Sequence, residues 1–330
     1  MKYVRLGATN LQVSDFCLGT MMFGGKTSEN DAISIIHRAL DAGVNFVDTA
    51  NVYNAGRSET IVGKALEGVR DDVVLATKVG MKMGEGPNQA GVSRLHIVHS
   101  TEASLRRLRT DHIDLYYIHW PTEAMYIEEM LRALEDLVRS GKILYPACSN
   151  FPAWLLCRAM WLQDVNAYAP MVAGQYPYNL IERGLDVEVL PAASALGVGI
   201  VTYRPLSAGA LTGKYLKGVP EDARGQSDDR LEPWSQRYRD GVSQLRDFAA
   251  ARGYTAADAA IAWVRSHPAV TAPIVGISRM EQLDANLRGF EWEMTTAERE
   301  EIAGYFPTEV WEEGGGRFPS WRRSFDIAPC

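Results

Sequence analysis

A repeated unit of strand, loop and helix is the feature of this 330-residue sequence that most limits its fold. Eight short apolar segments have the length and composition of buried strands, and amphipathic segments separate them. The expected strands are residues 16–19, 45–48, 73–78, 113–119, 144–149, 172–175, 199–203 and 273–276. Eight such units without an internal linker predict an α/β fold, a closed (β/α)8 TIM barrel that forms one domain over residues 1–330.

Local signals between the strands agree with this fold. Ser28, Ser58 and Ser93 precede expected helices, where a serine can cap the first turn. An open, doubly wound sheet is the alternative, and it would place a glycine-rich turn directly after the first strand. Gly24 and Gly25 come too late for that turn and lack the GxGxxG spacing. The closed barrel is therefore the preferred prediction.

Two irregular stretches lie outside the repeat. Residues 217–238 follow the seventh expected strand, and a loop of this length is typical of a functional lid, with a disordered excursion as the alternative. Residues 307–330 form an irregular C-terminal tail that contains Trp311, Phe318, Trp321 and Phe325. Aromatic residues in such a tail indicate that it docks on the barrel.

Composition and charge argue against several classes of protein. The formal net charge of -7 argues against nucleic acid or an anionic membrane as a partner, because both favour basic proteins. The sequence has no apolar run long enough to span a bilayer and no signal-peptide core after Met1, so we expect a cytoplasmic protein. Its four cysteines are scattered without metal-ligand spacing, so we expect reduced thiols and no metal site. No feature of the sequence sets the oligomeric state.

Four polar residues stand at or just after the ends of consecutive expected strands: Asp48, Tyr53, Lys78 and His119. Each alone has an ordinary explanation, as a helix cap, a packed phenol, a solvated lysine or a core histidine. Their joint placement favours a catalytic site, because the C-terminal rim of a parallel barrel is where such enzymes hold their chemistry. A nearby ammonium lowers a phenol pKa from its usual value of about 10, and a carboxylate holds the ammonium in place. Such a set is suited to giving a proton to a carbonyl oxygen.

Five longer segments carry a resemblance to a known family. They are DTANVYNAGRSE at 48–59, DHIDLYYIHWP at 111–121, GKILYPACSNF at 141–151, YRPLSAGALTGKY at 203–215 and GISRMEQLDAN at 276–286. In these segments, and along nearly its whole length, the sequence resembles the aldo-keto reductase superfamily. The resemblance implies an enzyme that binds NADP(H) on a (β/α)8 barrel without a Rossmann fold.

The resemblance assigns a role to each of the four strand-end residues. Tyr53 is implied to be the proton donor, and Lys78 to lower its pKa. Asp48 is implied to pair with Lys78, and His119 to orient the substrate carbonyl.

A long cofactor site is also implied. Ser149, Asn150 and Gln175 would hydrogen-bond the nicotinamide carboxamide, and Tyr203 would stack on the nicotinamide ring. The loop that follows Tyr203 would line the pyrophosphate through its small residues and backbone N–H groups. The full set of implied contacts is Gly19, Thr20, Met21, Asp48, Ser149, Asn150, Gln175, Tyr203, Arg204, Pro205, Leu206, Ser207, Gly209, Lys214, Arg224, Gly276, Ser278, Arg279, Gln282 and Asn286.

The last of these segments favours NADP(H) over NAD(H). Ser278 and Arg279 open an expected helix and can contact a 2′-phosphate, because helix N-termini favour anions. Gln282 and Asn286, one turn apart, can reach the adenine. Arg224, in the long loop, is expected to add a cation at the pyrophosphate.

The sequence departs from the family pattern beside the cofactor segments. Cys148 stands next to the nicotinamide contacts and is expected to fill space as a small apolar group. Arg204 stands where the family often has serine, and we expect it either to alter pyrophosphate binding or to pair with an acid. The expected substrate pocket consists of Met22, Phe23, Tyr53, His119 and Trp120.

These features predict an NADPH-dependent reductase that converts an aldehyde or ketone into an alcohol, reversibly. The substrate is expected to be a small molecule whose identity is set by variable loops, and the pocket aromatics favour a bulky apolar or cyclic compound. Two alternatives remain open. Potassium-channel β subunits share this fold and much of the cofactor site, so an NADP(H)-sensing regulatory subunit is one, although no channel-binding N-terminal extension is evident. A Schiff-base aldolase with Lys78 as nucleophile is the other.

Overall fold

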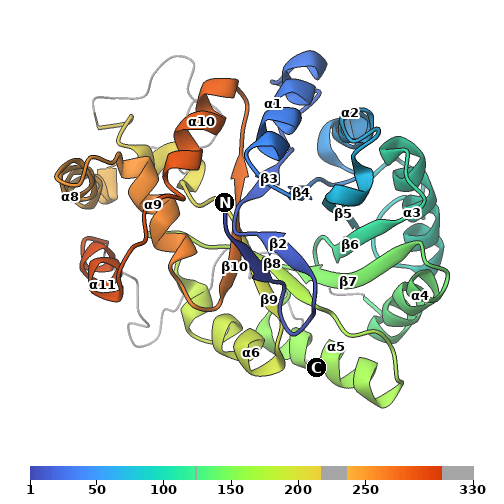
Figure 1. The fold of residues 1–330 in the computed structure, drawn as a ribbon. Helices are drawn as coiled ribbons and strands as arrows, with labels where there is room; N and C mark the ends of the chain where they lie inside the picture. The colour runs from blue at the N-terminus through green and yellow to red at the C-terminus, as the bar shows by residue number, and fades with distance from the viewer. Residues whose placement is uncertain (123–124, 217–235, 307–330) are drawn as a thin grey trace.

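A computed structural model describes residues 1–122, 125–216 and 236–306. Eight parallel strands close into a barrel in the order β10-β3-β4-β5-β6-β7-β8-β9 (Figure 1). The barrel strands are β3 (Cys17–Gly19), β4 (Phe46–Asp48), β5 (Val74–Val79), β6 (Ile113–Ile118), β7 (Ile143–Ser149), β8 (Ala173–Pro177), β9 (Gly199–Tyr203) and β10 (Val270–Gly276). The predicted (β/α)8 barrel is confirmed, and every strand overlaps its expected segment.

Helices surround the barrel on its outer side (Figure 1). They are α1 (Glu29–Asp41), α2 (Arg57–Ala65), α3 (Arg94–Leu108), α4 (Ile127–Arg139), α5 (Ala153–Val165), α6 (Val189–Leu196), α8 (Arg239–Ala250), α9 (Ala256–Arg265), α10 (Met280–Arg288) and α11 (Thr296–Gly304). Ser28 and Ser93 cap α1 and α3 as expected, each accepting a hydrogen bond from the backbone of the third helical residue. The expectation for Ser58 is wrong, because α2 begins one residue earlier and the Ser58 hydroxyl lies 2.9 Å from that of Thr20.

An N-terminal hairpin, not expected from the sequence, closes one end of the barrel. Its strands are β1 (Tyr3–Arg5) and β2 (Gln12–Ser14), which pair antiparallel. Leu6 and Val13 are fully buried in the barrel's inner core. Gly7, with φ of 56°, passes so close to the segment before β9 that a Cβ would lie 2.5 Å from the Gly197 carbonyl. The hairpin therefore covers the N-terminal ends of the strands, across the middle of the ring in Figure 1.

Alternate residues of the barrel strands fill its interior. The inner core includes Cys17, Phe46, Ala76, Leu115, Tyr117, Ala147, Ala173, Val201 and Ala272. Their neighbours along the strands, such as Leu18, Val47 and Tyr116, pack in the layer between the strands and the helices. Because the interior is filled and the hairpin covers one end, polar groups that act on a ligand must gather at the other end, the C-terminal rim.

The tail, most of the expected lid and Arg224 lie outside the described residues. Within the described part of the chain, no helix has the length and apolar character needed to cross a bilayer.

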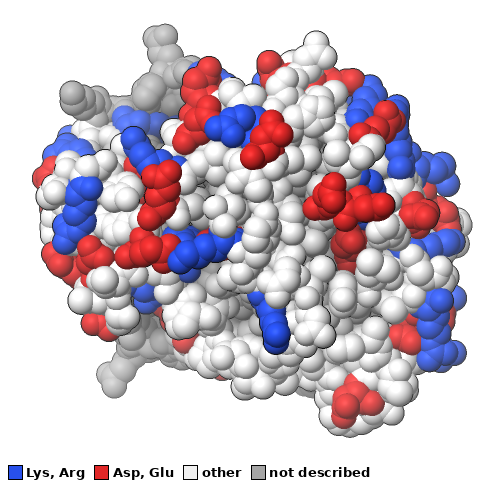
Figure 2. All heavy atoms as spheres, viewed as in Figure 1, with Lys and Arg blue, Asp and Glu red and all other residues white. Residues whose placement is uncertain are grey.

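Figure 2 shows one face of the molecule, on which acidic and basic side chains are interleaved over the outer helices. Neither sign forms a continuous field on that face.

Candidate active site

A buried lysine joins a carboxylate and a phenol at the C-terminal rim. Asp48 ends β4, Lys78 lies in β5, and Tyr53 opens the short helix η1 (Tyr53–Gly56). The Lys78 Nζ donates hydrogen bonds to Asp48 Oδ1 at 2.5 Å and to the Thr49 carbonyl at 2.7 Å. It also donates to the Tyr53 hydroxyl at 3.3 Å. An ammonium has three N–H donors, so these acceptors use all of them and fix its position.

Burial controls the protonation of these three groups. Burial opposes the charge on Lys78, but Asp48 and Tyr53 outweigh it, so the pKa of Lys78 is raised and the ammonium persists. Burial also raises the pKa of Asp48, and Lys78 offsets part of the rise. For Tyr53, burial raises the pKa and Lys78 lowers it only in part. The expectation of a net lowered tyrosine pKa is therefore wrong, and the phenol holds its proton at neutral pH, as a proton donor must.

His119 completes the group from the neighbouring strand. It directly follows β6, and its ring lies edge-on to that of Tyr53 with centroids 6.0 Å apart. Burial, and secondarily Lys78, lower the pKa of His119 to about 3, so the imidazole is neutral. Its Nδ1 is buried and has no hydrogen-bond partner among the described residues. A neutral imidazole can donate one hydrogen bond, which suits it to orient a carbonyl oxygen.

These protonation states predict the pH dependence of carbonyl reduction. We expect kcat/KM to stay constant from about pH 5 to about pH 8, because His119 stays neutral and Tyr53 stays protonated across this range. Activity should fall only at alkaline pH, where Tyr53, the proton donor predicted from the sequence, loses its proton. A pH–rate profile measures this. An acidic limb near the ordinary histidine value of about 6.5, absent in His119→Asn, would contradict the neutral role of His119.

The loop that carries Tyr53 has an unusual backbone conformation. Asn54 and Ala55 both have positive φ, 49° and 55°, a region that disfavours residues with a Cβ. The Asn54 amide donates to the carbonyls of Met21 and Phe23 at 3.0 and 2.8 Å, which ties the loop to the exit of β3. These contacts stabilise the turn that places Tyr53 beside Lys78.

A buried acid fixes the start of α2 behind this loop. Glu59 is fully buried and accepts hydrogen bonds from Thr77 Oγ1 and Arg107 Nε, both at 2.6 Å. Ser58, next to it, lies within 3.0 Å of the hydroxyls of Thr20 and Thr49. The SE pair of the DTANVYNAGRSE segment therefore positions the loop that carries Tyr53 and is not itself exposed to a ligand.

Four polar side chains form a connected network beside Asp48. Gln175 Nε2 donates to Asp48 Oδ2 at 2.8 Å. The Ser149 hydroxyl donates to the backbone carbonyl of Gln175 at 2.9 Å. Asn150 Nδ2 donates to Ser149 Oγ at 2.8 Å, and the Tyr203 hydroxyl donates to Asn150 Oδ1 at 2.8 Å. The structure thus gathers the residues that the sequence assigns to the nicotinamide. Their contact with that ring stays a prediction.

The loop after β9 has features of an anion site. The short helix η4 (Ser207–Thr212) contains three successive residues with positive φ: Ser207 at 47°, Ala208 at 55° and Gly209 at 97°. Left-handed turns of this kind can form anion-binding concavities. The Ser207 hydroxyl is fully buried without a hydrogen-bond partner among the described residues. A Cβ on Gly209 would lie 2.9 Å from Lys214 Nζ, so glycine lets this ammonium approach the turn. The orphaned hydroxyl and the cation fit a pyrophosphate.

Arg204 lies at the entry to this turn. Its φ is 60°, and its carbonyl accepts a hydrogen bond from Asn179 Nδ2 at 3.0 Å. Its guanidinium lies 6.0 Å from the centroid of the Tyr203 ring. No acid among the described residues pairs with it, so that part of the expectation is not met. Contact of Arg204, Pro205 and Leu206 with the pyrophosphate stays a prediction.

The start of α10 presents the remaining predicted cofactor residues. Ser278 donates from its backbone N and its hydroxyl to Gln282 Oε1 at 2.9 and 3.0 Å. Arg279 is exposed and precedes the helix directly, and Gly276 is the exposed last residue of β10. Asn286 is buried one turn beyond Gln282. An exposed guanidinium at a helix N-terminus is a suitable partner for a 2′-phosphate.

The rim after β3 differs in part from the predicted pocket. Met22 and Trp120 are partly exposed at the rim, as pocket residues would be, and Met21 is 41% exposed. Phe23 was expected to line the pocket, and this is wrong: its side chain is fully buried in the core between strands and helices. The Thr20 hydroxyl donates to the Asp48 carbonyl at 3.0 Å, so it is used within the protein.

Cys148 packs as expected. Its side chain is fully buried, and burial raises the pKa of its thiol to about 12. A protonated, enclosed thiol is a poor nucleophile. No group of three or more metal-ligating side chains occurs among the described residues.

Comparison with known proteins places this arrangement in a family. The model of the aldo/keto reductase family matches residues 15–305. An uncharacterised oxidoreductase of Bacillus subtilis, YrpG, is 41% identical over 302 residues, with 88% of this chain and 91% of that protein covered. The chain belongs to the aldo/keto reductase family. A probable voltage-gated potassium channel subunit beta of Arabidopsis thaliana is 36% identical, with 88% and 92% covered. Norsolorinic acid reductase B of Dothistroma septosporum is 32% identical, with 94% and 83% covered.

Family membership makes oxidoreductase activity the coarse functional expectation, since several relatives are named as oxidoreductases or reductases.

The structure adds buried groups that sequence reasoning missed. Tyr117 and Cys17 point into the barrel interior below the aldo/keto reductase site. The alternation of β6 could have placed Tyr117 inside, but only the register with β5 sets it next to Lys78. Asn51 is also buried, and neither polar atom of its amide has a partner among the described residues.

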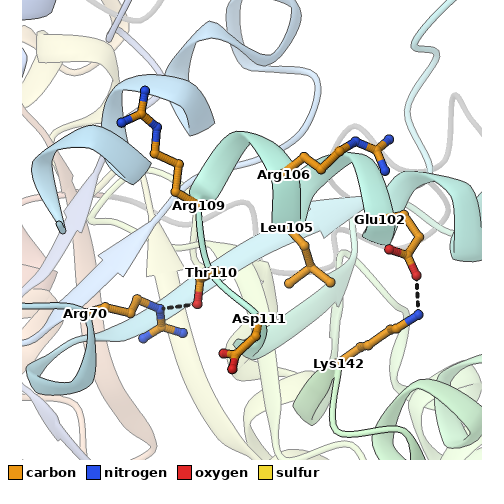
Figure 3. A pocket seen from close by; sticks show the side chains of 8 residues that line it. All are labelled: Arg70, Glu102, Leu105, Arg106, Arg109, Thr110, Asp111 and Lys142. Atoms are coloured by element: carbon orange, nitrogen blue, oxygen red, sulfur yellow. Dashed lines mark hydrogen bonds and ion pairs between the residues drawn. The ribbon is translucent and has the colours of Figure 1, made fainter.

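A separate hollow of about 730 Å³ lies away from this chemistry. Figure 3 shows it beside the C-terminal end of α3, near the starts of β6 and β7, and so at the opposite end of the barrel. Three of its four basic side chains are paired with acids: Arg70 with Asp114, Arg109 with Glu67 and Lys142 with Glu102. The hollow is open and its charges are largely compensated, so the rim is the candidate site.

Proposed function

We propose that this protein is an NADP(H)-dependent oxidoreductase that reduces an aldehyde or a ketone to an alcohol, reversibly. The observation that carries the proposal is the contact of Lys78 Nζ with both Asp48, at 2.5 Å, and the Tyr53 hydroxyl, at 3.3 Å, beside a neutral His119. A screen of carbonyl compounds for NADPH oxidation tests it. Absence of turnover with every aldehyde and ketone, in a protein that binds NADPH, would overturn it.

The chain's own groups divide the reaction between them. The bound dinucleotide would supply a hydride to the substrate carbon. His119 donates a hydrogen bond to the carbonyl oxygen and turns it toward Tyr53. Tyr53 gives its proton to that oxygen as negative charge develops there. Lys78 stabilises the tyrosinate that remains, and Asp48 keeps the ammonium in place.

Several structural features support the assigned cofactor. The network of Ser149, Asn150 and Gln175 would hold the carboxamide end, and Tyr203 would present its ring to the nicotinamide. The turn with Ser207, Gly209 and Lys214 would hold the pyrophosphate, as its buried hydroxyl and nearby ammonium suggest.

The exposed guanidinium at α10 supports NADPH over NADH. We expect NADPH to bind at least about tenfold more tightly than NADH, and Arg279→Ala to narrow this gap, because a charge-assisted contact with the 2′-phosphate is worth about 1.5–3 kcal/mol. A fluorescence titration with both cofactors measures it. Arg5→Ala, an exposed arginine of the N-terminal hairpin, is the matched control and should leave the ratio unchanged. Equal affinities in the parent chain would remove the role of Ser278 and Arg279.

A small carbonyl compound or alcohol is the proposed substrate, and Met22 and Trp120 at the rim favour a bulky apolar compound.

The proposed compartment is the cytoplasm. The described cysteines, Cys17, Cys148 and Cys157, are free thiols, which supports action in that reducing compartment.

An NADP(H)-sensing regulatory subunit is a second candidate, because relatives from Arabidopsis thaliana and Oryza sativa are named as probable potassium channel subunits beta. Turnover separates the two candidates: an enzyme oxidises many equivalents of NADPH with a good carbonyl substrate, whereas a sensor binds the cofactor with little or no turnover.

A Schiff-base aldolase is disfavoured, because its nucleophile must be a neutral amine and Asp48 keeps the pKa of Lys78 raised. Borohydride trapping of substrate on Lys78 would reverse that judgement.

A further inference from the structure

Two adjacent tyrosines of β6 lie on opposite sides of the barrel wall. Tyr116 belongs to the layer between strands and helices, and Tyr117 belongs to the inner core. Both are fully buried, and neither hydroxyl has a hydrogen-bond partner among the described residues. The two phenols therefore match in chemistry, burial and strand, and differ in which side of the barrel they face.

Tyr117 lies next to the catalytic lysine. It pairs with Lys78 in the parallel register of β5 and β6. The Lys78 Nζ is 5.9 Å from the centroid of the Tyr117 ring and 5.0 Å from that of the Tyr53 ring. The ammonium thus has one phenol ring on the ligand side and a second inside the barrel. A cation this close to an aromatic face is attracted to it, more strongly when water is excluded.

The Tyr117 hydroxyl has polar neighbours of its own. Burial raises its pKa well above the usual value, Asp48 and Cys17 raise it further, and the Gln175 amide lowers it. That amide is the group whose Nε2 donates to Asp48 Oδ2 at 2.8 Å. The phenol therefore stays neutral, so it acts on Lys78 through its ring face.

We propose that Tyr117 is a positioning residue of the active site: its ring supports the Lys78 ammonium from inside the barrel. The inference rests on the proposed function. Two substitutions separate the ring from the hydroxyl. Tyr117→Leu removes the ring face, and Tyr117→Phe removes the hydroxyl alone.

The ring is tested by the titration of Tyr53 in the protein without cofactor or substrate. Tyrosinate absorbance is followed with pH, and the curve of the matching Tyr53→Phe protein is subtracted. The charged and titratable groups that act on Tyr53 are Lys78, Asp48 and Cys17, with His119 neutral beside it. If the ring holds the ammonium near Tyr53, Tyr117→Leu should raise the Tyr53 midpoint by about half a unit or more, and Tyr117→Phe should leave it unchanged.

Tyr116→Phe and Tyr116→Leu are the matched controls, because Tyr116 is the buried phenol on the other side of the barrel wall. They should change thermal stability as much as the Tyr117 variants do without moving the Tyr53 midpoint.

A Tyr117→Leu protein whose Tyr53 midpoint matches that of Tyr116→Leu would overturn the proposal. If Tyr117→Leu is too unstable to titrate, Tyr117→Met, which also lacks the ring, takes its place, and an unchanged Tyr53 midpoint there would overturn the proposal. The titration needs neither turnover nor substrate, so an inactive protein with a shifted Tyr53 midpoint would separate a failure of the proposed reaction from a failure of this inference.

Discussion

Replacing Tyr53 by phenylalanine should reduce carbonyl turnover by about 100- to 10,000-fold while leaving NADPH binding nearly unchanged. The substitution deletes the hydroxyl that accepts from Lys78 Nζ at 3.3 Å and keeps the ring that lies edge-on to His119. The other hydrogen bonds of the ammonium, to Asp48 and to the Thr49 carbonyl, stay intact. The loss should therefore fall on proton transfer and not on folding or cofactor affinity.

Single-turnover kinetics with deuterated NADPH would show whether hydride transfer limits the rate in both proteins. Tyr3→Phe is a suitable control, because this exposed phenol of the N-terminal hairpin lies far along the chain from the candidate site and donates to the Gly43 carbonyl. Turnover that falls by less than about tenfold in Tyr53→Phe, with hydride transfer still limiting, would mean that another acid donates the proton. His119 would be the next residue to test, although its pKa of about 3 makes it a weak candidate.

The barrel was predictable because its strands are buried apolar segments that alternate with helices along the chain. Each apolar segment read from the sequence overlaps a strand of the structure, and the differences are at the ends: β10 begins at Val270, before the expected residue 273, and β6 ends at Ile118 instead of His119. Strand ends depend on which backbone groups find partners in the neighbouring strand, and a single segment does not specify that.

The hairpin was missed for a different reason. Its two strands have three residues each and are partly exposed, so they lack the continuous apolar segment that marks the equally short β3 and β4. What holds it is tertiary: Leu6 and Val13 are buried under the barrel, and the tight approach of Gly7 to Gly197 needs the finished barrel as a template. Local sequence does not contain that information.

The grouping at the candidate site was predictable because strand ends of a parallel barrel share one rim, so Asp48, Lys78 and His119 had to be neighbours. The sign of the Tyr53 pKa shift was not predictable, because burial is a property of the folded molecule and here it exceeds the effect of the lysine. The same holds for Tyr117, whose place beside Lys78 follows from the register of two strands and not from either strand alone.

Replacing Lys78 by methionine should reduce turnover by about 100-fold or more and also destabilise the protein by about 3–5 kcal/mol. The first effect arises because Lys78 is the group that lowers the pKa of Tyr53 against burial, so its loss makes the phenol a weaker acid. The second arises because the Asp48 carboxylate, 3% exposed, loses the cation at 2.5 Å and is left as an uncompensated buried charge. Turnover and urea unfolding measure the two effects separately.

The double variant Lys78→Met with Asp48→Asn distinguishes catalysis from folding. Removing both charges eliminates the unpaired carboxylate, so most of the lost stability should return, because replacing a whole buried ion pair is often neutral. Gln175, which donates to Asp48 Oδ2 at 2.8 Å, can still donate to an asparagine oxygen at that position. Turnover should nevertheless stay low, since no ammonium remains beside Tyr53 to stabilise the tyrosinate. A double variant that regained activity together with stability would show that Lys78 serves the fold, and the proton donor would then have to work without it.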